Sequence, residues 1–140
     1  MTKSEKVDIL RTYKDIDRRI KMLLDEKERW MERATSITPV YKQAPVSGGD
    51  GSGKIQSAIE KIDEIERELV DEIGRLADLR QIIVKGIAGI RSCKLRNLMT
   101  YRYIQGMTLE RTAYEMGMDE RWVRRLQSRA INQLTLESPP

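Results

Sequence analysis

The chain has 140 residues, of which 26 are Lys or Arg and 22 are Asp or Glu, with one Cys and no His. A single thiol excludes an internal disulfide, and the lack of histidine removes the usual Cys/His metal sites and His-assisted nucleophiles. No apolar run approaches the roughly 18 residues of a membrane span, and the mixed-charge start lacks the apolar stretch of a signal peptide. We therefore expect a cytoplasmic protein that is not an enzyme and has no metal, no cofactor and no membrane contact.

Positive charge is concentrated towards one end of the chain. Residues 1–90 contain 17 basic and 17 acidic residues, whereas residues 91–140 contain 9 basic and 5 acidic ones. The whole formal charge of +4 therefore lies after residue 90. A local excess of this kind indicates a polyanionic partner.

The first predicted element is a helix over about residues 4–35. Its seam positions alternate steps of four and three, which is the a/d pattern of a coiled coil. These positions are Ile9, Tyr13, Ile16, Ile20, Leu23, Lys27, Trp30 and Ala34, with Lys27 as the one polar interruption.

A second long helix is predicted over about residues 54–84. A seven-residue repeat runs through Ile55, Ile62, Leu69, Leu76, Ile83 and Ile90, and Ile59, Ile65, Ile73, Leu79 and Ile87 broaden it into a stripe. Gly86 and Gly89 lower helix propensity, so fraying or a bend is expected near them. The two matching seams predict a long antiparallel, coiled-coil-like hairpin, and the broad stripe also favours a homodimer formed through it.

Residues 36–53 connect the two helices. Two prolines and a run of Gly and Ser are typical of a flexible linker. The run from Gly48 to Lys54 matches part of a phosphate-binding loop, but Ile55 stands where that motif needs Ser or Thr for magnesium. We therefore predict a linker here and no nucleotide site.

Shorter helices are predicted in residues 91–136, which we expect to be a separate domain from the hairpin of residues 1–90. One helix runs from about Leu95 to Ile104 and is closed by Gly106, because glycine is favourable just after a helix end.

A helix-turn-helix follows. Thr108 is a candidate N-cap for a helix over about 109–116, and Asp119 is one for a helix from Glu120 to about Leu134. Gly117 between them can adopt the positive φ that such a turn needs. Ala113 is small, as required where the second helix crosses close by, although Thr112 stands where an aliphatic residue is commoner. We expect four residues to hold the helices together by facing inwards: Met116, Met118, Val123 and Leu126.

The outer face of the second helix is rich in arginine, which can bind guanine bidentately or grip phosphate. We predict base contacts from Glu120, Arg121, Arg124, Arg125 and Ser128, and phosphate contacts from Arg129 with Arg102 or Arg111. Trp122 has two open interpretations, packing against the preceding helix or touching DNA.

The stretch from Leu98 to Leu134, LMTYRYIQGMTLERTAYEMGMDERWVRRLQSRAINQL, resembles region 4 of bacterial sigma factors. The likeness rests on Arg-Tyr before a Gly-x-Thr-x-Glu turn, then Ala-x-x-x-Gly, Val-Arg-x-Leu and a final Arg-Ala. The whole chain is also similar to sigma-region-4-like proteins of phages and prophages of Gram-positive bacteria, through LLDEKERWMERAT, TPVYK and IDEIERELVDEIGRLADLR.

This resemblance implies a transcription regulator of phage or prophage genes in a bacterial host cell, with double-stranded DNA and RNA polymerase as partners. In region 4 the promoter contacts come from the positions of Glu120, Arg121, Arg124 and Arg125. A sigma factor typically has Arg then Glu at the first two positions and Gln at the last. Here the first pair is reversed and the last is Arg, so a target other than the standard −35 element is expected.

Two alternatives stay open at this point. Small terminase subunits also combine a helix-turn-helix with helical oligomerisation segments, so a phage DNA-packaging protein fits the pattern. A module that docks on RNA polymerase without binding DNA fits it as well, because Glu120 brings an acidic side chain to the outer face of the second helix.

Overall fold

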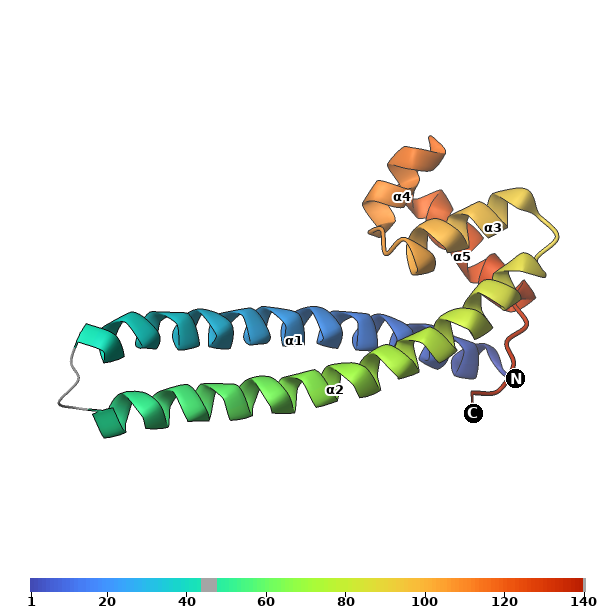
Figure 1. Cartoon of the computed structure of the whole chain (residues 1–140). Helices are drawn as coiled ribbons and strands as arrows, with labels where there is room; N and C mark the ends of the chain where they lie inside the picture. The colour runs from blue at the N-terminus through green and yellow to red at the C-terminus, as the bar shows by residue number, and fades with distance from the viewer. Residues whose placement is uncertain (44–47, 140) are drawn as a thin grey trace. The chain divides into compact units, whose positions relative to one another are not determined.

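A computed structural model describes residues 1–43 and 48–139. These residues form helices and no strand: α1 (Lys3–Gln43), α2 (Gly48–Ala88), α3 (Cys93–Met99), the π-helical turn η2 (Thr100–Ile104), α4 (Leu109–Met116) and α5 (Glu120–Gln133). Helices α1 and α2 form a long hairpin that the short helices follow in the chain (Figure 1). The predicted all-α fold class is confirmed. No helix in the described part of the chain is long and apolar enough to span a bilayer.

The long helices extend beyond their predicted ends. Helix α1 continues to Gln43 and α2 begins at Gly48, so most of the expected linker over residues 36–53 is helical, and its residues 44–47 lie outside the described residues. The prediction gave too much weight to Gly and Pro, whose propensities are a weak prior that structural context overrides. Because Gly48 to Lys54 belong to α2, the partial phosphate-binding motif forms no loop.

The predicted seams form the core of the hairpin. In α1, Tyr13, Ile16, Ile20 and Leu23 are buried, and in α2 Ile65, Leu69, Leu79 and Ile83 are buried. The stripe on α2 is wider than one helix can cover, since Ile59 and Ile73 stay about half exposed. Helix α1 therefore covers the centre of the apolar stripe on α2 and leaves one edge of the stripe exposed.

Contacts divide the chain into two compact units. We call residues 1–16 with 75–140 the helix-turn-helix unit, and residues 17–74 the hairpin unit. The first unit contains the start of α1 and the end of α2 besides the short helices. The division of the chain into domains at residue 90 stays a prediction.

Ion pairs join the two helices within the hairpin unit. Arg19 Nη2 lies 2.6 Å from Glu68 Oε1, and Lys27 Nζ lies 3.2 Å from Glu66 Oε1. The hydrogen bond and charge of Glu68 raise the pKa of Arg19. Pairs this exposed contribute little to stability, because solvent screens their charges, so the buried seam is the main source of cohesion.

The end of the chain packs against α2 within the helix-turn-helix unit. Leu134 and Leu136 are buried, and Lys85 Nζ lies 2.5 Å from Glu137 Oε1. A β-carbon on Gly86 would lie 2.8 Å from the carbonyl oxygen of Thr135. The predicted fraying is wrong at Gly86, because α2 passes through this residue and ends at Ala88, directly before Gly89. The missing side chain of Gly86 lets the tail cross close to the helix.

Candidate nucleic-acid interface

The turn between α4 and α5 has the predicted geometry. Gly117 has φ 63° and ψ 37°, and a β-carbon there would meet nothing within 4 Å. Glycine is therefore required here by the positive φ of the turn and not by a lack of space for a side chain. Gly117 N donates to Tyr114 O at 3.1 Å and Met118 N donates to Ala113 O at 3.0 Å, which satisfies carbonyl groups at the end of α4.

The two helix starts differ in how they are capped. Thr108 Oγ1 accepts a hydrogen bond from Arg111 N at 3.0 Å, as expected for an N-cap. Asp119 has the extended backbone of an N-cap, but its side chain accepts no capping hydrogen bond. Its carboxylate still stands at the positive end of the α5 dipole, where a negative charge is favourable.

Apolar contacts fix the angle between the helices. Ala113, Val123 and Leu126 are buried, as predicted, whereas Met116 and Met118 are only half-buried. Thr112 is fully buried, and its hydroxyl donates to Thr108 O at 2.9 Å. This hydrogen bond explains how a polar side chain replaces the commoner aliphatic residue.

Helix α3 packs against α5. Leu95, Leu98 and Met99 are buried on α3, as are Ala130 and Ile131 on α5. The α3 N-cap is Ser92, whose Oγ accepts from Leu95 N at 3.3 Å. Helix α5 is therefore held over most of its length, and one face of it remains free.

The free face of α5 carries the predicted arginines. Arg121, Arg124, Arg125 and Arg129 are all exposed, as is Glu120. Arg124 Nη2 lies 3.7 Å from Glu120 Oε1, which is a loose i,i+4 pair. In the described part of the chain, no hydrogen bond or ion pair engages the other three guanidinium groups. Three arginines therefore present all their donors to solvent from one helix.

The start of α1 contacts the same helix. Lys3 Nζ donates to Ser128 Oγ, and Lys6 Nζ donates to Asn132 O at 3.2 Å and Ile131 O at 3.4 Å. The second contact places a cation on the terminal carbonyls of α5, where the helix dipole favours it. These lysines lie about 125 positions from their partners, and no pattern in the sequence links them to α5.

Two of the predicted phosphate contacts are occupied within the protein. Arg102 is half-buried, and its Nε donates to Gln127 Oε1 at 2.8 Å while its Nη1 donates to Met107 O at 2.6 Å. Arg111 Nη2 lies 2.7 Å from Glu115 Oε1. The Arg102 contacts tie α5 to the segment before α4.

Two large aromatic side chains lie on the surface of this unit. Trp122 on α5 is 41% exposed, and Tyr114 on α4 is 76% exposed with the Arg111 guanidinium 5.4 Å from its ring. A third aromatic residue, Tyr103, is buried, and burial raises the pKa of its hydroxyl despite the nearby Arg102 and Arg11.

Residues 94–135 match the family model described as sigma-70, region 4. The match covers less than a third of the chain and includes α4, Gly117 and all of α5. Neither the curated proteins nor the solved structures contain a match to this chain. The C-terminal segment is thus similar to sigma-70 region 4, a DNA-binding helix-turn-helix domain, and this similarity is consistent with a regulator of transcription.

Proposed function

We propose that this protein is a sequence-specific DNA-binding transcription regulator that inserts α5 into the major groove. The observation that carries the proposal is the exposed arginine face of α5 on a helix whose opposite side is buried. A rigid helix with forked donors on its outer face is suited to reading guanine O6 and N7 in the major groove.

Base contacts come from Glu120, Arg121, Arg124, Arg125 and Ser128. Arg121 and Arg125 can bind bases without first losing a contact within the protein. Arg124 must give up its loose ion pair with Glu120 before it binds a base. That exchange costs little, because an exposed pair contributes less than about 1 kcal/mol. Glu120, once released, can accept a hydrogen bond from cytosine N4.

Phosphate contacts come first from Arg129, which is exposed and free. Arg102 and Arg111 are weaker candidates, because a phosphate competes with the internal partners of both. Lys3 beside Ser128 is a stronger one, since it adds a long, exposed cation at the edge of the same face. Such contacts position the protein on the duplex without specifying sequence.

The biological setting belongs to the same proposal. The protein acts on phage or prophage genes in the cytoplasm of a bacterial host cell, in contact with RNA polymerase and as a homodimer through its hairpin. The arginine face supports a target other than the −35 element, since Arg125 replaces the glutamine typical of sigma factors.

A second candidate is an RNA-polymerase-docking module that does not bind DNA. The exposure of Tyr114 and Trp122 favours it, because exposed aromatic residues are typical anchors of protein–protein interfaces.

The variant Arg124→Ala/Arg125→Ala separates the two candidates. Its matched control is Arg29→Ala/Arg33→Ala, which removes the same charge from exposed positions of α1 in the hairpin unit. Fluorescence anisotropy with a labelled duplex should show a loss of more than tenfold in affinity for the first variant and little for the control. Equal effects of both would indicate attraction by net charge alone, and tight polymerase binding by the first variant would favour the docking module.

A further inference from the structure

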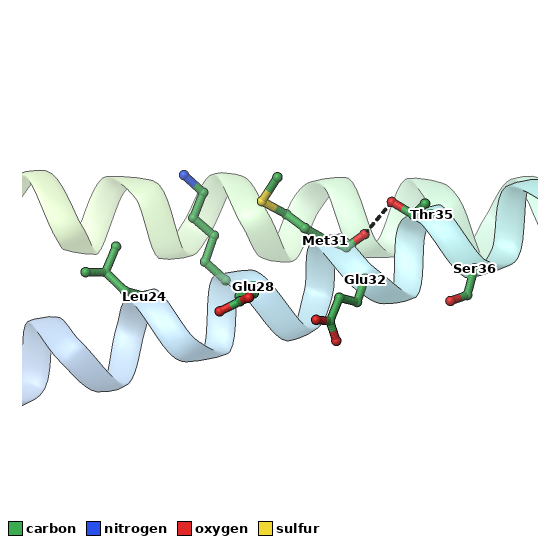
Figure 2. Close-up of a pocket in the computed structure, with 7 residues that line it drawn as sticks. Leu24, Glu28, Met31, Glu32, Thr35 and Ser36 are labelled. Atoms are coloured by element: carbon green, nitrogen blue, oxygen red, sulfur yellow. Dashed lines mark hydrogen bonds between the residues drawn. The ribbon is translucent and has the colours of Figure 1, made fainter.

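Among the described residues of the hairpin unit, exposed apolar side chains on α1 and α2 form a face that none of these residues covers. On α1 this face contains Leu24 and Met31, and on α2 it contains Ile59, Val70 and Ile73, all of them between 45% and 71% exposed. Leu24 and Met31 are seven residues apart and rise from the same side of α1 (Figure 2). A spacing of seven residues places both side chains on one side of α1, next to the seam that is buried in the hairpin.

Helical geometry places the two sets on one side of the hairpin. At 100° per residue, Ile59, Val70 and Ile73 fall on the same flank of the buried α2 seam, whose other flank is charged. Leu24 and Met31 fall on the corresponding flank of α1, and in an antiparallel pair these two flanks face the same way. We call these five residues the open face.

An ion pair within the hairpin unit links the two halves of the open face. Lys27 lines a shallow groove with Leu24 and Met31, and Glu66 lines another with Val70. Lys27 Nζ lies 3.2 Å from Glu66 Oε1. Leu24 and Met31 therefore lie on the α1 side of this ion pair and Val70 lies on its α2 side. Charged side chains also line the two grooves, namely Glu28, Glu32, Asp63 and Arg67.

We infer that a second copy of this chain covers the open face, so that two hairpin units form a four-helix bundle. The exposed parts of the five side chains amount to roughly 500 Å² per copy, which is close to the apolar share of the ~800 Å² that each partner buries in a standard interface. A two-fold interface needs a self-complementary patch, and a face that carries apolar side chains on both helices together with charges of both signs can meet that condition.

Charge favours one arrangement of the two copies. Within the hairpin unit, residues 17–36 of α1 carry 6 basic and 5 acidic side chains, whereas residues 53–74 of α2 carry 3 basic and 7 acidic ones. Packing α2 beside its own copy would bring two acidic helices together. Packing α1 beside α2 of the second copy avoids this repulsion.

The test is the mass of the full chain in solution, measured by sedimentation without DNA. The wild type is expected to be a dimer, and Val70→Glu/Ile73→Glu is expected to be a monomer with unchanged helix content. Met22→Glu is the control, because Met22 is 56% exposed in the same unit and a step of 100° per residue places it on the opposite side of α1 from Leu24. A monomeric wild type, or a variant that remains dimeric, would overturn the inference, as would equal dissociation by the control. A ring of many subunits would overturn it too.

Disulfide trapping tests the arrangement in a Cys93→Ser background. A mixture of Leu24→Cys and Val70→Cys chains is expected to form the mixed disulfide, and Val70→Cys alone is expected to form few dimers. Predominant cross-linking of Val70→Cys with itself would contradict the α1-beside-α2 packing. Neither experiment depends on DNA, so they can fail without affecting the proposed DNA binding, which the arginine variants test separately.

Discussion

Leu136 lies so close to Gly86 that a β-carbon on residue 86 would fall 2.8 Å from Leu136 Cδ2. The backbone oxygen of Thr135 would lie at the same distance, so the new atom cannot be accommodated by moving a flexible side chain alone. The tail after α5 and the end of α2 therefore fit each other only with glycine at this position.

Gly86→Ala is expected to lower the free energy of unfolding by about 1–3 kcal/mol, because it overpacks this contact. Gly74→Ala is the matched control within the same helix. A β-carbon on Gly74 would meet nothing within 4 Å, so this variant should raise stability by about 0.5–1 kcal/mol. Urea unfolding followed by circular dichroism measures both changes, and stabilisation by Gly86→Ala would refute the packing described.

Removing the Arg102 side chain should lower the stability of the fold, whereas removing the Arg129 side chain should weaken DNA binding. Arg102→Ala breaks hydrogen bonds to Gln127 and Met107 and should lower the free energy of unfolding by about 1.5–3 kcal/mol. Arg129→Ala should leave stability unchanged within about 0.5 kcal/mol and weaken DNA binding instead. Thermal unfolding and duplex binding of the two variants give the comparison, and an unaffected stability of Arg102→Ala would argue against its structural role.

Lys3 should act as a phosphate contact next to Ser128. Lys3→Ala is expected to weaken duplex binding a few-fold and to reduce the slope of log K against log salt by about one unit, as one lost phosphate contact does. Lys21→Ala removes an equal charge from the hairpin unit, where Lys21 pairs with Asp17, and should leave the slope unchanged. Identical salt slopes for wild type and Lys3→Ala would exclude this contact.

Ionisation of the Tyr103 hydroxyl should lower the stability of the folded protein at alkaline pH. Burial raises its pKa in the folded state above the unfolded value of about 10, so the folded protein holds this proton more tightly. The resulting stabilisation is complete below the unfolded pKa and is lost as pH rises through the folded pKa. Tyr103→Phe has no such proton, so the variant should show a shallower decline in unfolding free energy as pH rises above about 10. Equal declines would contradict this assignment.

Local signals in the sequence predicted the parts of the fold that depend on near neighbours. The heptad seams gave the hairpin, Thr108 gave a helix start, and Gly117 gave the positive φ of the turn. Each of these follows from spacing or backbone conformation over a few residues. The exposed arginines of α5 were predictable for the same reason, because an amphipathic helix fixes which side faces solvent.

Contacts between distant segments were not predictable in this way. Lys6 meets the α5 carbonyls and Gly86 meets the tail only because the fold brings these segments together. Leu10 is buried although it lies off the predicted seam, while Ile9 on the seam is only half-buried. Arg102 looked like a surface cation, and only its position beside Gln127 and Met107 shows that its donors are used internally.

Selection of bound duplexes from a random DNA pool, carried out with wild type and with Arg124→Ala/Arg125→Ala, shows whether α5 reads DNA sequence. We expect wild type to enrich a defined motif different from the −35 element, and we expect the variant to lose this enrichment while keeping its helix content. A two-fold repeat in the motif would agree with a dimer. Absence of any enrichment by a folded wild type, or the same motif enriched by the variant, would contradict sequence reading by α5.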